Sequence, residues 1–215
     1  MIATVFALLA TSCCVSTWCF RKRAFQTSMR EPLLEPLLRS QRIRRVLPYI
    51  RRHANCRLLD IGCGWEAKFL LAVEPYIASG VGVDFKAPEL NDGKLRAIRL
   101  TLEDRLPFAD NSFDLVTMLA VLEHLAQPEA ILREIHRVLA PGGELVLTVP
   151  SKVAKPVLEF LAFRLGIVSR EEIADHKTYY DRESLVSLMK LTGFKVTKHR
   201  YFQLGMNNFC VAKYR

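Results

Sequence analysis

The chain has 215 residues, half of them hydrophobic and a quarter charged, with a formal net charge of +9. This length suits one sizeable domain and is short for two, and the composition excludes a largely disordered or fibrous protein. Residues 57–215 contain 21 Lys and Arg residues and 20 Asp and Glu residues and are nearly neutral. Residues 21–56 contain ten Lys and Arg residues and two Asp and Glu residues, so most of the net positive charge lies there. This basic arm has no aromatic residues spaced for base stacking, so nucleic acid is disfavoured as a partner and a small molecule is expected.

Six cysteines, at positions 13, 14, 19, 56, 63 and 210, form no CxxC pair and no His/Cys cluster with metal-ligand spacing. The cysteine pattern therefore indicates neither a zinc site nor a disulfide framework. We expect no bound metal and a reducing, cytoplasmic compartment.

The N-terminal segment, residues 1–20, carries no charged side chain and is followed at once by Arg21, Lys22 and Arg23. A helix of about 20 apolar residues can cross the hydrocarbon layer of a membrane. Positive charge after the apolar stretch suits an anchor, because a cleavable signal has its positive charge before that stretch. We interpret residues 1–23 as a membrane anchor that holds the protein at the cytoplasmic face, with a cleaved signal or a misassigned start as alternatives.

Residues 24–56 are predicted to be a basic linker followed by a covering helix. The sequence Glu-Pro-Leu-Leu occurs twice in a row from Glu31, and this short repeat is typical of a linker. Residues 39–52 then have the spacing of a basic amphipathic helix, with Ile43, Val46 and Ile50 on one apolar face. Such a helix can cover the domain that follows or lie on anionic lipid, and the covering role is favoured.

From residue 57 onward the apolar pattern alternates between strand and helix, which predicts a parallel sheet with right-handed crossovers. The clearest helices are expected at residues 127–139 and 182–191. Strands are expected at residues 57–61, 80–84, 97–101, 113–119 and 144–149, and a terminal hairpin at residues 194–201 and 207–213. The prediction is an α/β fold with a doubly wound sheet of seven strands, mostly parallel, with an antiparallel last strand.

A glycine turn follows the first of these strands, in the sequence Leu-Leu-Asp-Ile-Gly-Cys-Gly that ends at Gly64. Glycine lets the backbone approach a ligand closely, and the N–H groups at the start of a following helix favour an anionic group. The same turn satisfies the G-x-G-x-x-G/A pattern of dinucleotide sites, and Asp84 follows Gly62 at the distance expected of a ribose-binding carboxylate. A nicotinamide-dependent oxidoreductase is therefore one alternative at this point.

Three later segments distinguish the alternatives: LPFADNSFDLV from Leu106, EHL from Glu123 and LAPGGEL from Leu139. In this order, after the glycine turn, they closely resemble the class I S-adenosylmethionine-dependent methyltransferase family, in its type 11-like branch. The resemblance runs from about Arg57 to Pro150 and returns at Gly193 and Phe194. It implies a Rossmann-like fold in residues 57–215, S-adenosyl-L-methionine as the cofactor, and methyl transfer to a small-molecule acceptor.

The resemblance also implies roles for single residues in cofactor binding. Asp60 is expected near the cofactor's amino group, Gly62 and Gly64 beside the methionine carboxylate, Asp84 and Phe85 at the ribose and adenine, and Leu119 in backbone contact with the cofactor. Two residues depart from the family pattern: Glu66 replaces the third glycine, where it constricts the turn or points outward, and Leu102 replaces an acid. Adenine recognition then passes to backbone groups at Leu102 or to Glu103. These departures leave open a catalytically inactive cofactor-binding scaffold.

Residues on the acceptor side are implied by the same resemblance. His124 lies where the family places residues beside the methyl group, and an imidazole there can deprotonate an acceptor, although orientation alone suffices for some acceptors. Glu123, His176 and Tyr179 are further candidates on the substrate side. Residues 151–181 form the predicted acceptor-site insertion, in which residues 153–168 are unusually apolar. This stretch is either deeply buried or in contact with lipid or an apolar acceptor, so we expect an amphipathic or lipid-like acceptor. The sequence gives no indication of the oligomeric state.

Overall fold

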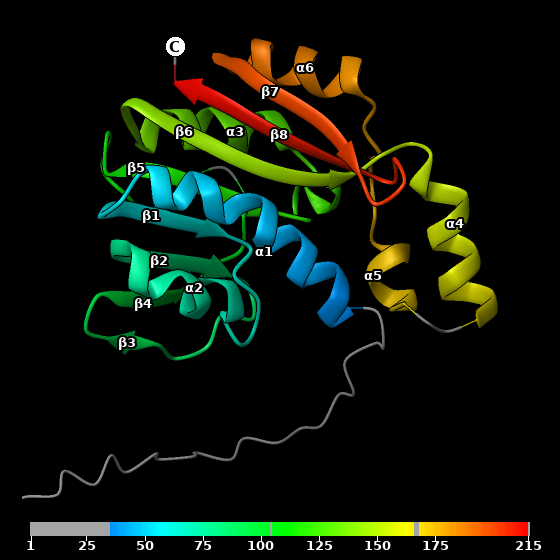
Figure 1. Ribbon diagram of the computed structural model, residues 1–215, viewed down its shortest axis with the longest axis horizontal. Helices are drawn as coiled ribbons and strands as arrows, with labels where there is room; N and C mark the ends of the chain where they lie inside the picture. Colours follow the sequence, from blue (N-terminus) through cyan, green and yellow to red (C-terminus); the bar gives the residue numbers. More distant parts are fainter. Residues whose placement is uncertain (1–34, 104, 166–167, 215) are drawn as a thin grey trace, which may run out of the picture. The chain divides into compact units, whose positions relative to one another are not determined.

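An eight-stranded mixed sheet forms the centre of the protein, with helices on both of its faces (Figure 1). The computed structural model describes residues 35–103, 105–165 and 168–214. The strand order is β3-β4-β2-β1-β5-β6-β8-β7. The strands are β1 (Cys56–Ile61), β2 (Ile77–Asp84), β3 (Asn91–Asp92), β4 (Leu95–Arg99), β5 (Phe113–Leu119), β6 (Leu139–Pro150), β7 (Phe194–Phe202) and β8 (Asn207–Tyr214).

The pairing directions confirm the predicted Rossmann-like α/β architecture. Strand β1 pairs in parallel with β2 and β5, and the parallel set continues to β4 on one side and β6 on the other. The last strand, β8, is antiparallel to both β6 and β7. All seven predicted strands are present, and the eighth is the two-residue β3, which pairs antiparallel with β4 at the sheet edge. A strand this short has no periodic pattern from which it could be predicted.

Helices fill the connections between the strands. They are α1 (Glu35–Arg52), α2 (Lys68–Val73), η1 (Glu74–Tyr76), η2 (Leu122–His124), α3 (Pro128–Val138), α4 (Ala154–Phe160), η3 (Leu161–Leu165), α5 (Arg170–Ala174) and α6 (Arg182–Leu191). Helix α3 begins at a proline, whose missing N–H costs nothing in a first turn. Helix α6 has the predicted bounds because Asp181 and Ser184 form a capping box at its start.

Two hydrophobic clusters hold the helices to opposite faces of the sheet. On one face, buried side chains of α3 and α6, including Leu132 and Met189, pack against the strands. On the other face, α1 and α2 contribute residues such as Ile50 and Leu70. The predicted amphipathic helix at residues 39–52 is therefore present as part of α1, with its apolar side buried against the sheet. Burial of whole aliphatic side chains stabilises the fold by about 1.5 to 3 kcal/mol each.

The expected membrane anchor, residues 1–23, lies outside the described residues and stays a prediction. Within residues 35–103, 105–165 and 168–214, no helix is both long and apolar enough to cross a membrane.

Candidate cofactor and acceptor site

The carboxyl ends of β1, β2 and β5 lie next to one another because these parallel strands are neighbours in the sheet. Strand β1 connects to β2 on one side, whereas β5 lies on its other side, so the chain order reverses between β1 and β5. In open α/β sheets, ligands bind outside the carboxyl ends of the strands at such a reversal. The glycine turn after β1, Asp84 at the end of β2 and η2 after β5 all lie at this edge.

Gly62 and Gly64 differ in what surrounds their missing side chains. Both have a positive φ, of 78° at Gly62 and 70° at Gly64. A Cβ added to Gly62 would lie 2.2 Å from Cγ2 of Val121, so the space beside Gly62 is filled by the protein itself. A Cβ added to Gly64 would meet no protein atom within 4 Å. The backbone at Gly64 therefore borders open space that a ligand can enter, as expected for a cofactor-binding turn.

Asp84 is already engaged by the backbone around it. Its Oδ2 accepts a hydrogen bond from the N–H of Gly64 (3.0 Å), and its Oδ1 accepts one from the N–H of Lys86 (2.7 Å). The Gly64 N–H, expected beside the methionine carboxylate, thus donates to Asp84 in this structure. A carboxylate has about four lone-pair sites, so Asp84 retains acceptors for ribose hydroxyls. The next residue, Phe85, is 60% exposed, and the ammonium group of Lys86 lies over its ring, 4.9 Å from the ring centroid.

Asp60 is a buried carboxyl at the end of β1, with only 2% of its surface exposed. The hydroxyl of Thr117 on β5 donates a hydrogen bond to it (2.7 Å). Burial raises the pKa of Asp60 to about 7, the Thr117 hydrogen bond acts in the opposite direction, and the negative charge of Asp84 raises it further. Thr117 was not among the predicted residues. Its role depends on the register between β1 and β5, in which Asp60 and Thr117 are partners.

The remaining cofactor candidates lie in different surroundings. Leu102 is half-buried and packs against the core, whereas Glu103 is exposed. Leu119 is half-buried at the end of β5 and packs against the second hydrophobic cluster. Glu66, which replaces the third glycine of the turn, forms an ion pair with Lys68 at the start of α2. The side chain at position 66 is therefore held by a neighbour in the chain.

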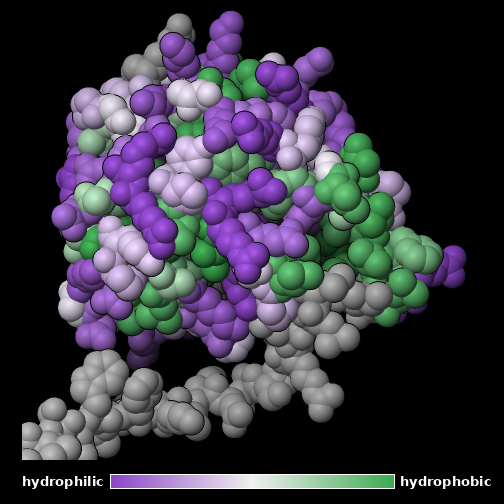
Figure 2. Space-filling model, viewed as in Figure 1, coloured by the Kyte–Doolittle hydropathy of each residue, from purple (hydrophilic) through white to green (hydrophobic). Residues whose placement is uncertain are grey.

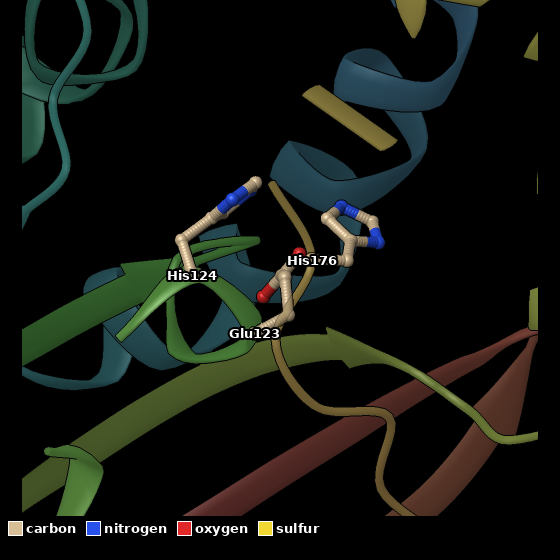
Figure 3. Close-up of side chains that lie close together, drawn as sticks. All are labelled: Glu123, His124 and His176. Carbon is tan, nitrogen blue, oxygen red and sulfur yellow. The ribbon is translucent and has the colours of Figure 1, made fainter. Parts of the chain in front are cut away.

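Three acceptor-side candidates, Glu123, His124 and His176, come together from two segments far apart in the sequence (Figure 3), and the fourth, Tyr179, is hydrogen-bonded to His176. Glu123 and His124 belong to η2, and His176 follows α5. The rings of His124 and His176 meet edge to face, with centroids 4.7 Å apart. Nδ1 of His124 lies 2.9 Å from a carboxylate oxygen of Asp175, and Nδ1 of His176 lies 2.9 Å from the Tyr179 hydroxyl. Asp175 was not predicted, although its place directly before His176 is a signal that could have identified it.

Burial sets the protonation of this cluster. Glu123 is 1% exposed, and burial raises its pKa to about 8, while a backbone hydrogen bond and the positive charge of Arg42 act in the opposite direction. Burial, together with the positive charge of His124, lowers the pKa of His176 to about 4. Burial also raises the pKa of Tyr179 to about 12, with contributions from the negative charges of Glu159 and Glu123. At neutral pH these shifts favour the uncharged forms of all three groups.

The segment around α4 exposes its apolar side chains to solvent. The exposed fractions are 67% for Val153, 39% for Val157, 55% for Phe160, 49% for Phe163 and 52% for Leu165. Figure 2 shows a hydrophobic region at its right-hand edge, where Figure 1 shows α4. We call these five residues the α4 apolar patch. Its exposure is contrary to deep burial, one of the two alternatives for this stretch, and favours contact with lipid or an apolar acceptor.

Comparison with known proteins assigns the family. A family model described as a methyltransferase domain matches residues 28–199, which is more than half of the chain. The chain belongs to the class I S-adenosylmethionine-dependent methyltransferases. This membership decides against the nicotinamide-dependent oxidoreductase, the alternative left open by the glycine turn alone. It also implies S-adenosylmethionine as the methyl donor.

Relatives and solved structures agree with the family. The chain is 31% identical over 131 residues to the ubiquinone/menaquinone biosynthesis C-methyltransferase UbiE of Neisseria meningitidis, and the match covers 54% of each chain. The chain thus spans about half the length of that relative. A protein of Encephalitozoon cuniculi named as a methyltransferase is 33% identical over 156 residues, covering 66% of this chain and 71% of that one.

Solved structures share the fold of this chain. An S-adenosylmethionine-dependent methyltransferase from Mesorhizobium loti superposes with a TM-score of 0.60 at 18% identity, covering 78% of this chain and 97% of that one. At this level of identity the likeness concerns the fold.

Proposed function

We propose that this methyltransferase transfers the methyl group of S-adenosylmethionine to an amphipathic, lipid-like small molecule. The observation that carries the proposal is the α4 apolar patch, which lies in the same insertion as His176 and Tyr179. The α4 segment is tied to α5, the helix just before His176, because Nε of Arg170 on α5 donates a hydrogen bond to the carbonyl of Ala162 (2.9 Å). An apolar surface next to polar groups suits a molecule with an apolar part and a polar reacting end.

The names of the relatives support the same class of acceptor. UbiE proteins are named for C-methylation in ubiquinone and menaquinone biosynthesis. By this likeness, a quinone precursor is the first acceptor to test. The prediction that His124 removes a proton from the acceptor stays a prediction.

For the cofactor, we propose that Asp60 and Asp84 provide the two recognition carboxylates. When bound, the cofactor supplies a methyl group on a cationic sulfonium. Asp84 would hold the ribose hydroxyls at the end of β2, and charge-assisted hydrogen bonds of this kind contribute about 1.5 to 3 kcal/mol each. Asp60 would face the amino group, and the open backbone at Gly64 would border the methionine carboxylate. Phe85, Leu119 and the backbone at Leu102 or Glu103 would line the rest.

Calorimetric titration tests the cofactor assignment. S-adenosylhomocysteine is expected to bind and NADH is not, and Asp84→Ala should weaken S-adenosylhomocysteine binding by about tenfold or more. Binding without any turnover would favour the inactive scaffold.

Methylation of fractionated extracts tests the acceptor. With S-adenosylmethionine labelled in its methyl group, label should appear in apolar fractions of lipid and metabolite extracts. The double variant Phe160→Ser/Phe163→Ser should raise the KM for the apolar acceptor and leave affinity for S-adenosylhomocysteine unchanged. Leu204, which is 97% exposed outside the α4 apolar patch, provides the matched control Leu204→Ser. Label confined to polar fractions would refute the lipid-like acceptor.

A further inference from the structure

One carboxylate and two imidazoles converge in the acceptor-side cluster. A carboxylate oxygen of Glu123 and ring nitrogens of His124 and His176 all lie within 4.8 Å of one another (Figure 3). Two histidines and one carboxylate make up a common protein ligand set for zinc and other first-row transition metals. Sequence spacing does not indicate this ligand set, because His176 is distant from Glu123 and His124 along the chain.

The hydrogen bonding of Glu123 points independently to a ligand. Its Oε2 is buried and has no hydrogen-bond partner among the described residues. Buried carboxylates are ordinarily paired, hydrogen-bonded or coordinated to metal, because an unsatisfied polar atom in the interior is costly. A cation beside Oε2 would satisfy this oxygen. The positive charge of Arg42 also acts on Glu123 and would compete with such a cation.

Both imidazoles have a hydrogen-bonded Nδ1, as metal-binding histidines commonly do. Each Nδ1 has an oxygen partner at 2.9 Å, a carboxylate oxygen of Asp175 for His124 and the hydroxyl of Tyr179 for His176. When Nδ1–H donates to such an oxygen, the lone pair of Nε2 is available to an ion, and the ring orientation is fixed. The segment after α5 is itself tied to η2, because the N–H of Lys177 donates to the carbonyl of Glu123 (2.8 Å).

We propose that Glu123, His124 and His176 bind one divalent transition-metal ion, with Zn²⁺ preferred over Mg²⁺. Nitrogen ligands favour Zn²⁺, whereas Mg²⁺ prefers oxygen ligands and retains its water. Three protein ligands leave at least one coordination position for another group. If the proposed acceptor has a hydroxyl, its oxygen can bind there and lose its proton to solvent more easily, and His124 then acts as a ligand and not as a base. This use of the ion rests on the proposed function, whereas metal binding itself does not.

Calorimetry on the full-length, chelator-treated protein tests the site. One Zn²⁺ per chain should bind and MgCl₂ should produce no saturable heat. Glu123→Gln and His176→Gln should each weaken Zn²⁺ binding by about 100-fold, and Asp175→Asn and Tyr179→Phe by about tenfold. Arg42→Gln should strengthen it, because a competing positive charge is removed. His199→Gln is the matched control, since His199 lies on β7 and hydrogen-bonds Asn208.

Two further measurements keep the outcomes distinct. The absorption spectrum of the Co²⁺-loaded protein should lack thiolate charge-transfer bands, which would indicate binding by cysteines. Each variant must still bind S-adenosylhomocysteine, which reports an intact fold. The metal site is overturned if S-adenosylhomocysteine binding is retained but wild type does not bind Zn²⁺. It is also overturned if wild type and His176→Gln bind Zn²⁺ equally well. Normal Zn²⁺ binding without methylation of apolar acceptors would instead overturn the proposed function alone.

Discussion

Cofactor binding should release a proton from Asp60. In the free protein the carboxyl is buried, and its pKa is raised to about 7 by burial, against a hydrogen bond from Thr117 and with a contribution from Asp84. In the proposed site, this carboxyl faces the positively charged amino group of the cofactor, which favours the ionised form. Binding and ionisation of Asp60 are then linked, so affinity should fall as the pH drops below the free-state pKa.

The size of the effect follows from that pKa. With a pKa of about 7 for Asp60, the ionised fraction falls from about nine tenths at about pH 8 to about one tenth at about pH 6. The Kd for S-adenosylhomocysteine should therefore rise about tenfold over this range. Calorimetry in two buffers with different ionisation enthalpies measures both the Kd and the number of protons released.

Two variants separate Asp60 from other titrating groups. Asp60→Asn keeps the shape of the side chain but cannot ionise, so its binding should be weaker and should not depend on pH in this range. Thr117→Val removes the hydrogen bond that lowers the pKa of Asp60, so the midpoint of the pH profile should move upward. A wild-type Kd that is equal at both pH values, with no proton released, would refute the linkage and the placement of Asp60 beside the amino group.

Three predictions concern stability, each measured by urea denaturation. The folded-state pKa of Asp60 is raised from 3.8 to about 7. As the pH rises through this window, the free energy of unfolding of wild type should therefore fall by up to about 4 kcal/mol relative to that of Asp60→Asn. Parallel pH profiles of the two proteins would contradict the raised pKa. Gly62→Ala should lower the free energy of unfolding by about 2 kcal/mol more than Gly64→Ala does, because only the alanine at position 62 places its Cβ against Val121. Equal losses of stability in the two variants would exclude that contact. The pKa of Glu134 is lowered by its hydrogen bond to Arg137, so the stability that it contributes is present above about pH 4.5 and lost in more acidic solution. The variant Glu134→Gln should not show this acid-dependent loss of stability. If the stability of Glu134→Gln falls with acid in the same way as that of wild type, the contribution of Glu134 is disproved.

Much of the fold could be predicted because local patterns and tertiary structure agree in this chain. Apolar runs bounded by glycine, proline and charged residues correspond to the central strands, and α6 keeps its predicted bounds through a local capping box. The early start of β6 was missed. Residues 141–143, Pro-Gly-Gly, predict a break before the strand, yet β6 begins at Leu139, which pairs with Phe113 across the sheet. Pairing with a neighbouring strand is not visible in one segment's pattern.

The sequence names candidate site residues one by one, but it does not predict their hydrogen-bond partners. The family resemblance indicated Asp60 and His124, whereas their partners Thr117 and Asp175 come from strand register and from the packing of a distant segment. The α4 apolar patch shows a similar limit, because periodicity reports that a helix is apolar on more than one side and leaves open whether those sides are covered.

The glycine turn shows how one motif serves both the fold and the site. The sequence assigns Gly62 and Gly64 the same task, close approach of the backbone to a ligand. In the structure, Gly62 is instead in contact with Val121, which links the end of β1 to the segment after β5, whereas Gly64 borders open space. Asp84 joins the two functions, since it accepts the N–H of Gly64 and thereby fixes the turn relative to β2. A ribose that binds Asp84 would meet a carboxylate already positioned by the backbone, so little side-chain conformational entropy would be lost on binding.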